Sequence, residues 1–196
     1  GIGWSKDEYE VSGVPYKYRG ERANEFLQLL KRIWTDEVVE FKGQFYSIPA
    51  SKIGPKPVQK PHPPILLGGF SPKTFLRIVN YADGWIPVAG FGPLKQLEQA
   101  INGLREGARK ADKDPSKIRV FVLTYPNVLD SSSSSTSSSE QQRLPMTGTT
   151  DQIGTDIDQI KAMDVEHIIF GHIFSPIGKD MKKMIEITKQ LARFAK

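Results

Sequence analysis

The sequence of 196 residues contains no cysteine. Disulfides, thiolate metal sites and cysteine nucleophiles are therefore excluded, and a reducing compartment is permitted. No apolar run approaches the roughly 20 residues needed to span a bilayer, and no signal-peptide pattern opens the chain. We therefore expect a cytoplasmic protein without a membrane partner.

The short motifs of several enzyme classes are missing as well. The chain has no HExxH, GxSxG or P-loop pattern, which leaves metalloprotease, α/β-hydrolase and Walker-type NTPase functions without support. Two of the 3 histidines, His167 and His172, flank one predicted strand. Their odd spacing puts them on opposite faces of that strand, so we expect no metal site.

Positive charge is in modest excess. The 27 Lys and Arg residues outnumber the 22 Asp and Glu residues, which gives a formal charge of +5. The two signs are interleaved along predicted helices, as in residues 21–31 and 98–110, and this is typical of solvated helix faces. A nucleic-acid-binding surface would more often cluster basic residues with aromatics, so no nucleic-acid partner is expected. The surplus can still help to hold an anionic cofactor.

Apolar periodicity predicts an alternation of strands and helices. Amphipathic helices are predicted over residues 19–34, 73–82, 94–111, 150–163 and 179–194. Strands are predicted over residues 65–67, 85–89, 118–124 and 167–170, together with the end of a strand at Ile2 and a hairpin turn over 41–46. The composition further predicts a proline-rich connector over 53–64 and a serine-rich, low-complexity loop over 131–139.

This alternation predicts βα units around a parallel sheet. A complete eight-stranded βα barrel needs roughly 250 residues, more than the 196 present here. We therefore predict an α/β fold of TIM-barrel-like (β/α)8 type, in which residues 1–196 form a single partial domain, the C-terminal half of the barrel. A self-contained open sheet remains the alternative. Because unpaired strand edges invite association, we expect a homo-oligomer.

The clearest candidate for a binding site is the segment Leu67-Gly68-Gly69-Phe70-Ser71-Pro72. Two glycines at the end of a strand let a ligand approach the backbone closely, and the helix that follows directs free N–H groups at it. Ser71 is suited to cap this helix, and Pro72 to be its first residue. The segment is either an anion or phosphate cradle or a plain tight turn. We take Gly68, Gly69 and Ser71 as candidate cofactor-binding residues.

Two further loops place glycine beside acidic and aromatic residues. In the loop over residues 1–8, the candidate cofactor-binding residues are Gly3, Trp4 and Asp7, and a tight turn in which Trp4 packs is the alternative. In the second loop, Asp83 is suited to cap a turn, and Gly84 is expected to take a positive φ. An ordinary connection into the next strand explains this second loop equally well.

A series of short elements follows in a fixed order along the first half of the chain. They are Gly1-Ile2-Gly3-Trp4 with Glu8, Arg19-Gly20 with Arg22 and Glu25, Trp34, Phe41, Gly43 and Phe45, Pro55-Lys56-Pro57, Pro63-Pro64-Ile65, Gly68-Gly69, and Asp83-Gly84-Trp85. No single element is specific, but their order resembles the luciferase-like monooxygenase superfamily, and especially its F420-dependent oxidoreductases. Beyond Gly90 the likeness is only the general βα rhythm.

The resemblance implies a TIM-like barrel that binds a flavin or the deazaflavin F420 at the C-terminal ends of its strands and acts on a small-molecule substrate. It implies hydride transfer through F420, with FMN-dependent monooxygenation and a non-catalytic barrel fragment as alternatives. It also implies that Glu8 fixes its own loop, against an arginine such as Arg22. Catalytic residues stay unassigned, because the resembling proteins often supply an acid/base residue from a part that precedes Gly1.

Overall fold

The computed structural model describes residues 2–129, 143–175 and 177–195, so the predicted serine-rich loop over 131–139 lies outside the described residues. The helices are α1 (Lys6–Val11), α2 (Arg19–Thr35), α3 (Pro72–Tyr81), α4 (Leu94–Lys110), α5 (Thr150–Lys161) and α6 (Met181–Ala192). The strands are β1 (Val39–Lys42), β2 (Ser47–Ser51), β3 (Leu66–Leu67), β4 (Gly84–Trp85), β5 (Val88–Ala89), β6 (Arg119–Thr124), β7 (Asn127–Val128), β8 (Thr147–Gly148) and β9 (His167–Phe170). The short 3-10 helices include η1 (Pro115–Lys117) and η4 (Arg193–Ala195).

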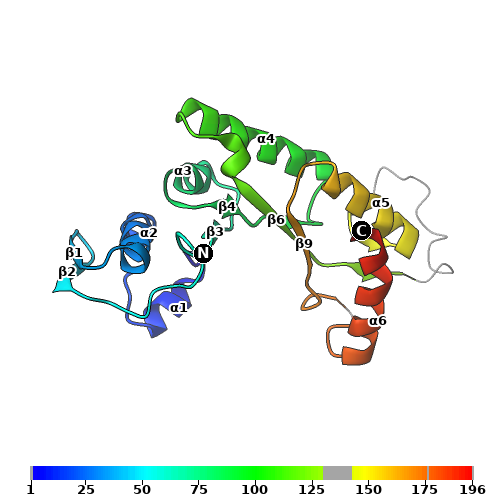
Figure 1. Cartoon of the computed structure of the whole chain (residues 1–196). Coiled ribbons are helices and arrows are strands. Elements are labelled where there is room, and N and C mark those ends of the chain that lie inside the picture. The colour runs from blue at the N-terminus through cyan, green and yellow to red at the C-terminus, as the bar shows by residue number, and fades with distance from the viewer. Residues whose placement is uncertain (1, 130–142, 176, 196) are drawn as a thin grey trace.

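A parallel sheet with β6 at its centre organises the molecule (Figure 1). One edge of β6 pairs first with β4 and then with β5, and β9 pairs with its other edge. Strand β3 continues the sheet beyond β4. Every one of these pairs is parallel, as the alternation of strands and helices predicts, and within the described residues the sheet stays open rather than closing into a ring.

The predicted strand over residues 85–89 is divided into β4 and β5. Pro87 lies at the division, and it has no N–H group to donate to a strand ladder. The carbonyl of Pro87 still accepts a hydrogen bond from the backbone N of Leu123 at 2.9 Å. The two short strands therefore follow the same edge of β6 on either side of the interruption.

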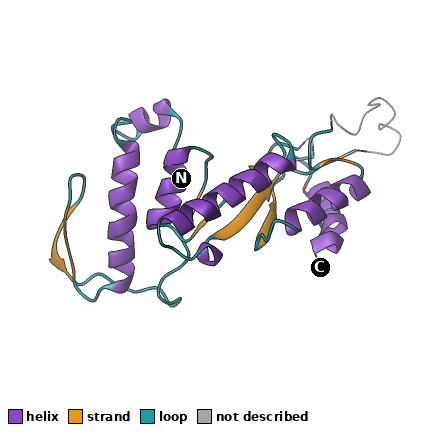
Figure 2. Ribbon diagram, turned by 90° about the horizontal axis from the view of Figure 1, so that it is seen from above, coloured by secondary structure: helices purple, strands orange, loops and turns teal. Residues whose placement is uncertain are grey.

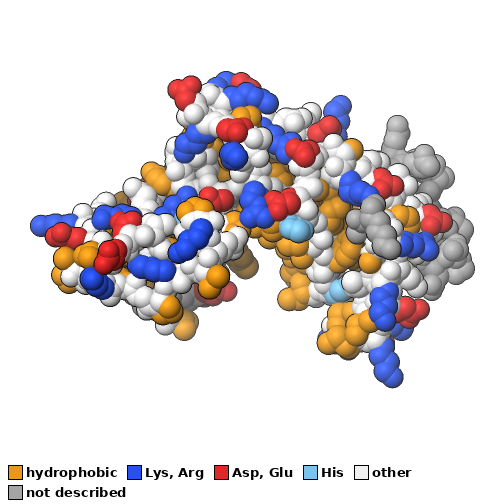
Figure 3. Space-filling model, in the orientation of Figure 1, with side chains coloured by type: hydrophobic (Ala, Val, Ile, Leu, Met, Phe, Trp, Pro, Cys, Tyr) orange, Lys and Arg blue, Asp and Glu red, His pale blue; other side chains and the backbone are white. Residues whose placement is uncertain are grey.

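Helices cover one face of this sheet and leave the other face partly open. Along β6, Val120, Val122 and Thr124 are buried, whereas Phe121 and Leu123, which alternate with them, are only partly buried. Helices α3 and α4 lie over the covered face in Figures 1 and 2. Figure 3 shows hydrophobic side chains gathered in the hollow on the opposite side. The main core therefore lies between the sheet and the helices.

The predicted helices are present, and their ends differ from the predictions by no more than two residues. Ser71 caps α3 as expected, because its hydroxyl oxygen accepts the N–H of Thr74 at 3.1 Å. Helix α5 begins with a reciprocal capping box, in which Thr149 and Gln152 each bind the other's backbone N–H. No helix in these described ranges is long and apolar enough to cross a lipid bilayer.

The start of the chain differs from the prediction. Ile2 is not part of a strand, and the segment instead leads into α1, where the Ser5 hydroxyl accepts the backbone N–H of Glu8 at 3.3 Å. The expected pairing of Glu8 with Arg22 is wrong. Arg22 donates to the carbonyl of Pro15 at 2.9 Å, and Glu8 is exposed. A local helix cap and a carbonyl acceptor therefore take the places of the expected ion pair.

The predicted hairpin forms from β1 and β2, and the carboxylate of Glu25 on α2 anchors its turn. Glu25 accepts the backbone N–H groups of Gln44 and Phe45, each at 2.9 Å, and of Tyr46 at 2.7 Å. A side chain at Gly43 would collide with this carboxylate and would approach the Phe41 ring to 2.8 Å. The glycine is therefore required by the close approach of the turn to the acid.

Replacement of Glu25 by Gln should lower the free energy of unfolding by about 2 kcal/mol, because hydrogen bonds to a charged acceptor contribute about 1.5–3 kcal/mol and an amide nitrogen cannot accept N–H groups. Urea unfolding followed by circular dichroism measures this change. The control is Glu40→Gln, which removes the same charge from an exposed position on β1. Equal stabilities of the two variants would show that the carboxylate does not anchor the turn.

Candidate functional site

The turn between β3 and α3 presents an exposed stretch of backbone. Gly68, Gly69 and Ser71 are all exposed, and Gly69 has a φ of +103°, a conformation that side chains rarely adopt. A side chain at Gly69 would also come within 3.2 Å of the Thr74 hydroxyl oxygen. The first residue of α3, Pro72, has no N–H group. The first helical N–H group without an acceptor in α3 therefore belongs to Lys73.

The buried side chain of Trp85 on β4 holds this turn in place. Its indole N–H donates to the carbonyl of Gly69 at 2.8 Å, and the side chain of Trp85 is completely buried. The rings of Phe70 and Phe75 each meet the indole edge to face, with centroids 5.1 Å away. Because the indole is fixed on several sides, the exposed turn rests on a rigid support.

Two cavities with largely apolar linings lie along the carboxyl ends of the strands. One, of about 250 Å³, lies between Phe70 and the segment 88–97. The other, of about 310 Å³, is lined by Phe91, Tyr125 and Phe174, which follow β5, β6 and β9. The Tyr125 ring lies 4.9 Å from that of Phe174 and 6.2 Å from that of Phe91. This edge of a βα sheet is where the catalytic residues of barrel enzymes gather.

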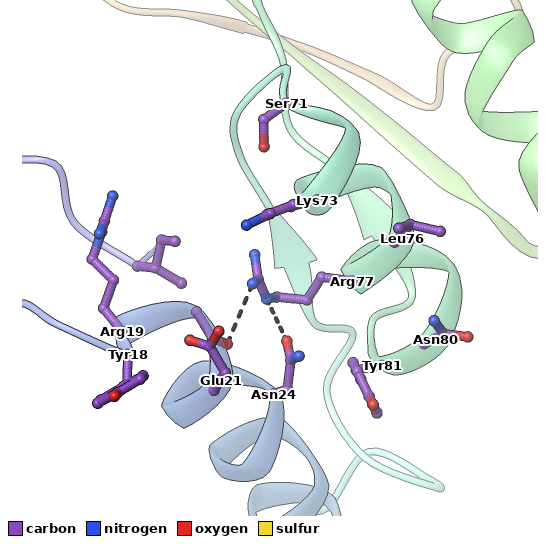
Figure 4. Close-up of a pocket in the computed structure, with 12 residues that line it drawn as sticks. Tyr18, Arg19, Glu21, Asn24, Ser71, Lys73, Leu76, Arg77, Asn80 and Tyr81 are labelled. Atoms are coloured by element: carbon purple, nitrogen blue, oxygen red, sulfur yellow. Dashed lines mark hydrogen bonds between the residues drawn. The ribbon is translucent and has the colours of Figure 1, made fainter.

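A third and larger cavity, of about 570 Å³, lies between α2 and α3 (Figure 4). Its lining includes Ser71, so it adjoins the glycine turn. Arg19, Lys73 and Arg77 also line it, and in Figure 4 the head groups of Lys73 and Arg77 point into the space between the two helices. This cavity is therefore basic, in contrast to the two apolar ones.

The structure brings together only half of the residues predicted to bind the cofactor. Gly68, Gly69 and Ser71 form one turn, whereas Gly3, Trp4 and Asp7 are exposed and line none of the three cavities just described. Trp4 is 87% exposed, so the alternative in which it packs in a tight turn is not what the structure shows. Gly3 has a φ of +71° and lies against the Tyr9 ring. From this loop it is Ile2 that reaches the basic cavity.

Several residues that line these cavities are not among the binding residues predicted from the sequence. Tyr125 and Phe174 follow the ends of β6 and β9, and Asn24 follows Gly20 by one helical turn on α2. The signal for the two aromatics was their position just after a predicted strand. Nothing in the sequence pairs Asn24 with Arg77, because they are 53 residues apart and meet only through helix packing.

Three titratable groups with shifted pKa values, Arg119, Glu166 and His172, lie away from these cavities. At the start of β6, the Arg119 guanidinium donates to the carboxylate of Glu166 through Nε at 2.6 Å and through Nη2. This contact lowers the pKa of Glu166 and raises that of Arg119. Burial lowers the pKa of His172, whose Nε2 lies 2.9 Å from the Thr188 hydroxyl. Among the residues described, no three His, Asp or Glu side chains converge as a metal site would require.

A comparison with protein families identifies this arrangement. The family model described as luciferase-like monooxygenase matches residues 1–165. The chain belongs to this family. It is 36% identical over 126 residues to the uncharacterized protein Mb0965c of Mycobacterium bovis. The matched residues are 63% of this chain and 42% of that protein, so the chain spans less than half the length of this relative. The fold class predicted from the sequence, an α/β chain of TIM-barrel-like type, is confirmed.

Relatives of this luciferase-like chain include enzymes with different cofactors. An FMNH(2)-dependent dimethylsulfone monooxygenase of Pseudomonas putida is 42% identical over 72 residues, which are 35% of this chain and 20% of that protein. An F420-dependent glucose-6-phosphate dehydrogenase of Amycolatopsis mediterranei is 29% identical over 116 residues, 58% of this chain and 34% of that protein. An F420-dependent secondary alcohol dehydrogenase, solved with an F420-acetone adduct, has a TM-score of 0.71 at 21% identity, covering 97% of this chain and 68% of that one.

The residues that carry the luciferase-like resemblance have structural roles as well. Arg77 donates to the carbonyl of Gly20 at 3.3 Å, and a side chain at Gly20 would lie 3.0 Å from the Arg77 guanidinium. The carboxylate of Asp83 accepts the backbone N–H of Ile65 at 2.7 Å, so it ties the start of the β3 segment to the segment before β4 instead of capping a local turn. Several of these elements therefore fix loops and helices around the sheet.

Proposed function

We propose that this chain forms part of the cofactor pocket of an F420-dependent oxidoreductase that transfers a hydride to or from a small organic substrate. The observation that carries the proposal is the exposed Gly68–Ser71 turn at the carboxyl end of β3, next to an apolar cavity. A ring system suits the apolar cavity, and a phosphate suits the glycine turn. When bound, the deazaflavin supplies the redox chemistry, and the protein supplies binding and orientation.

In this proposal each part of the site has a separate task. The backbone at Gly68 and Gly69 approaches the phosphate, and the N–H of Lys73 and the first turn of α3 favour its negative charge. Trp85 keeps the turn from moving by binding the Gly69 carbonyl. Phe91 and Tyr125 line an apolar space, and this suits the apolar part of a ring or of a small organic substrate.

The charges near the turn favour F420, whose tail is polyanionic, over FMN. Lys73 and Arg77 line the basic cavity that adjoins Ser71, so they would be available to hold an acidic tail extending from a phosphate bound at the turn. Lys56, in the proline-rich connector, does not line this cavity and donates to the carbonyl of Ile33 at 2.6 Å. FMN-linked oxygenation is the second candidate, because the chain is 42% identical over 72 residues to an FMNH(2)-dependent monooxygenase.

The test is Gly68→Ala, with the affinity of the purified protein for F420 and for FMN measured by calorimetric titration at low and high salt. The nearest atom to a side chain at Gly68 is the Ile86 carbonyl oxygen at 3.5 Å, so alanine fits the folded protein. We expect F420 affinity to fall at least about tenfold, because the methyl group occupies the path of the ligand. The variant Gly69→Ala is less informative, since the φ of Gly69 strains any side chain.

Gly103→Ala is the matched control, because Gly103 lies on α4 and a Cβ atom added there would meet no atom within 4 Å. Unchanged F420 binding in Gly68→Ala would move the phosphate elsewhere and leave a plain tight turn. Tight FMN binding that is insensitive to salt, without F420 binding, would favour the monooxygenase. A protein that binds neither ring would favour the non-catalytic alternative.

A further inference from the structure

The cavity between α2 and α3 carries an excess of positive charge. Among the described residues that line it, Arg19, Lys73 and Arg77 are cationic, and Glu21 is the acidic one (Figure 4). In the part of the chain that the structure describes, none of the three cations forms an ion pair with a carboxylate. Like charges around one cavity repel each other, so an anion that enters the cavity relieves this repulsion.

Arg77 is already held in a fixed orientation. Its side chain is 8% exposed, its Nε donates to Asn24 Oδ1 at 2.6 Å, and its Nη2 donates to the Gly20 carbonyl at 3.3 Å. Its Nη1 makes no hydrogen bond with any described residue, and Figure 4 shows the guanidinium between the two helices. A guanidinium that is fixed before binding loses little conformational entropy when it meets an anion.

Arg19 is held by a different contact on the other side of the cavity. Its guanidinium carbon lies 3.8 Å from the centroid of the Tyr16 ring, and its Nε is buried without a hydrogen-bond partner in the described residues. Stacking on the ring removes water from this charge. A partly dehydrated cation gains more from an anionic partner at its remaining N–H groups than a fully solvated one does.

We infer that this cavity binds a small organic polyanion that carries phosphate or carboxylate groups, through Arg19, Lys73 and Arg77. Its volume of about 570 Å³ is in the range of small-molecule sites and exceeds the need of a single phosphate. Ile2, Leu76 and Tyr81 add apolar surface for the rest of the molecule. The bound group is either a separate organic anion or the anionic end of a cofactor held at the glycine turn. The second case is open because Ser71 belongs to both the turn and this cavity. The inference itself does not rest on the proposed redox function.

The test uses inorganic pyrophosphate as the probe, in calorimetric titrations of the whole chain without any cofactor. We expect binding that weakens as salt is raised, and a loss of about tenfold or more in affinity in both Lys73→Gln and Arg19→Gln. Lys183→Gln is the control, because it removes the same charge from an exposed position in the first turn of α6. Circular dichroism verifies that each variant is folded, and Lys73, being exposed, is expected to be replaced without loss of structure.

Absence of pyrophosphate binding at millimolar concentrations would overturn the inference. So would an equal affinity of folded Lys73→Gln and wild-type protein. A second titration, in the presence of F420 or FMN, distinguishes the two sources, because a cofactor whose anionic end fills the cavity competes with pyrophosphate and a cofactor bound elsewhere does not. A protein that binds pyrophosphate through these residues but neither ring would contradict the proposed function and leave this inference standing.

Discussion

Replacing Gly84 with alanine is expected to lower the free energy of unfolding by about 3 kcal/mol. A Cβ atom at this position would lie 2.7 Å from Leu66 Cδ2 and 2.9 Å from the carbonyl carbon of Arg119, and closer still to the Arg119 carbonyl oxygen. Overpacking a core typically costs 1–3 kcal/mol, and here the obstacle is the backbone of β6, which cannot move aside as a side chain can. Urea unfolding followed by circular dichroism measures the change.

The control for this variant is Gly103→Ala. Gly103 lies within α4, and a side chain there would meet no atom within 4 Å. Alanine in a helix interior is about 0.5–1 kcal/mol more favourable than glycine, so this variant should be slightly more stable than the wild type. If Gly84→Ala were as stable as Gly103→Ala, β4 would not be held between β3 and β6 at the separation that the structure shows.

Gly84 also illustrates how far the sequence could predict the fold. The segment Asp83-Gly84-Trp85 suggests a turn with a positive φ at the glycine, but Gly84 is not among the residues with positive φ and lies in β4. The glycine is required because two neighbouring strands approach it. Such a requirement depends on contacts with Leu66 and Arg119, which are distant in the sequence, so local patterns cannot reveal it.

Helices and strands were predicted well where the signal is local. The cap at Ser71 and the amphipathic pattern of α4 both depend on residues within a few positions of each other. The strand expected at Ile2 failed for the opposite reason. A strand exists only when a partner strand pairs with it, and no described residue pairs with Ile2 in a sheet.

The candidate site was predicted in part, for the same physical reason. The glycine turn is a local feature that a few consecutive residues define. The basic cavity is not local, because Arg19 and Arg77 reach it from α2 and α3, and the packing of these two helices creates the space. The aromatic cavity likewise combines Phe91, Tyr125 and Phe174 from three separate loops. Sequence order alone could not show which loops meet.

Asp156→Asn is expected to lower the free energy of unfolding by about 3 kcal/mol. Asp156 on α5 is 3% exposed and accepts hydrogen bonds from Arg143 Nη1 at 2.8 Å, from Arg143 Nη2 at 2.7 Å and from the Met146 backbone N at 2.7 Å. Removing one partner of a buried pair costs about 3–5 kcal/mol, because the remaining charge stays desolvated. The side chain of Arg143 is 26% exposed, and this access to water places the expected loss at the lower end of that range.

The substitution should also loosen one wall of the candidate site. Leu144, Pro145 and Thr147 line the aromatic cavity, and Asp156 fixes the segment that carries them. The control is Asp158→Asn, which removes the same charge from the same helix at a side chain that is 66% exposed and 3.8 Å from Lys161. An exposed pair of this kind contributes 1 kcal/mol or less, so that variant should unfold at nearly the wild-type urea concentration. If Asp156→Asn also unfolded at nearly the wild-type urea concentration, the Asp156 carboxylate would not be what ties residues 144–147 to α5. The wall of the aromatic cavity would then depend on other contacts.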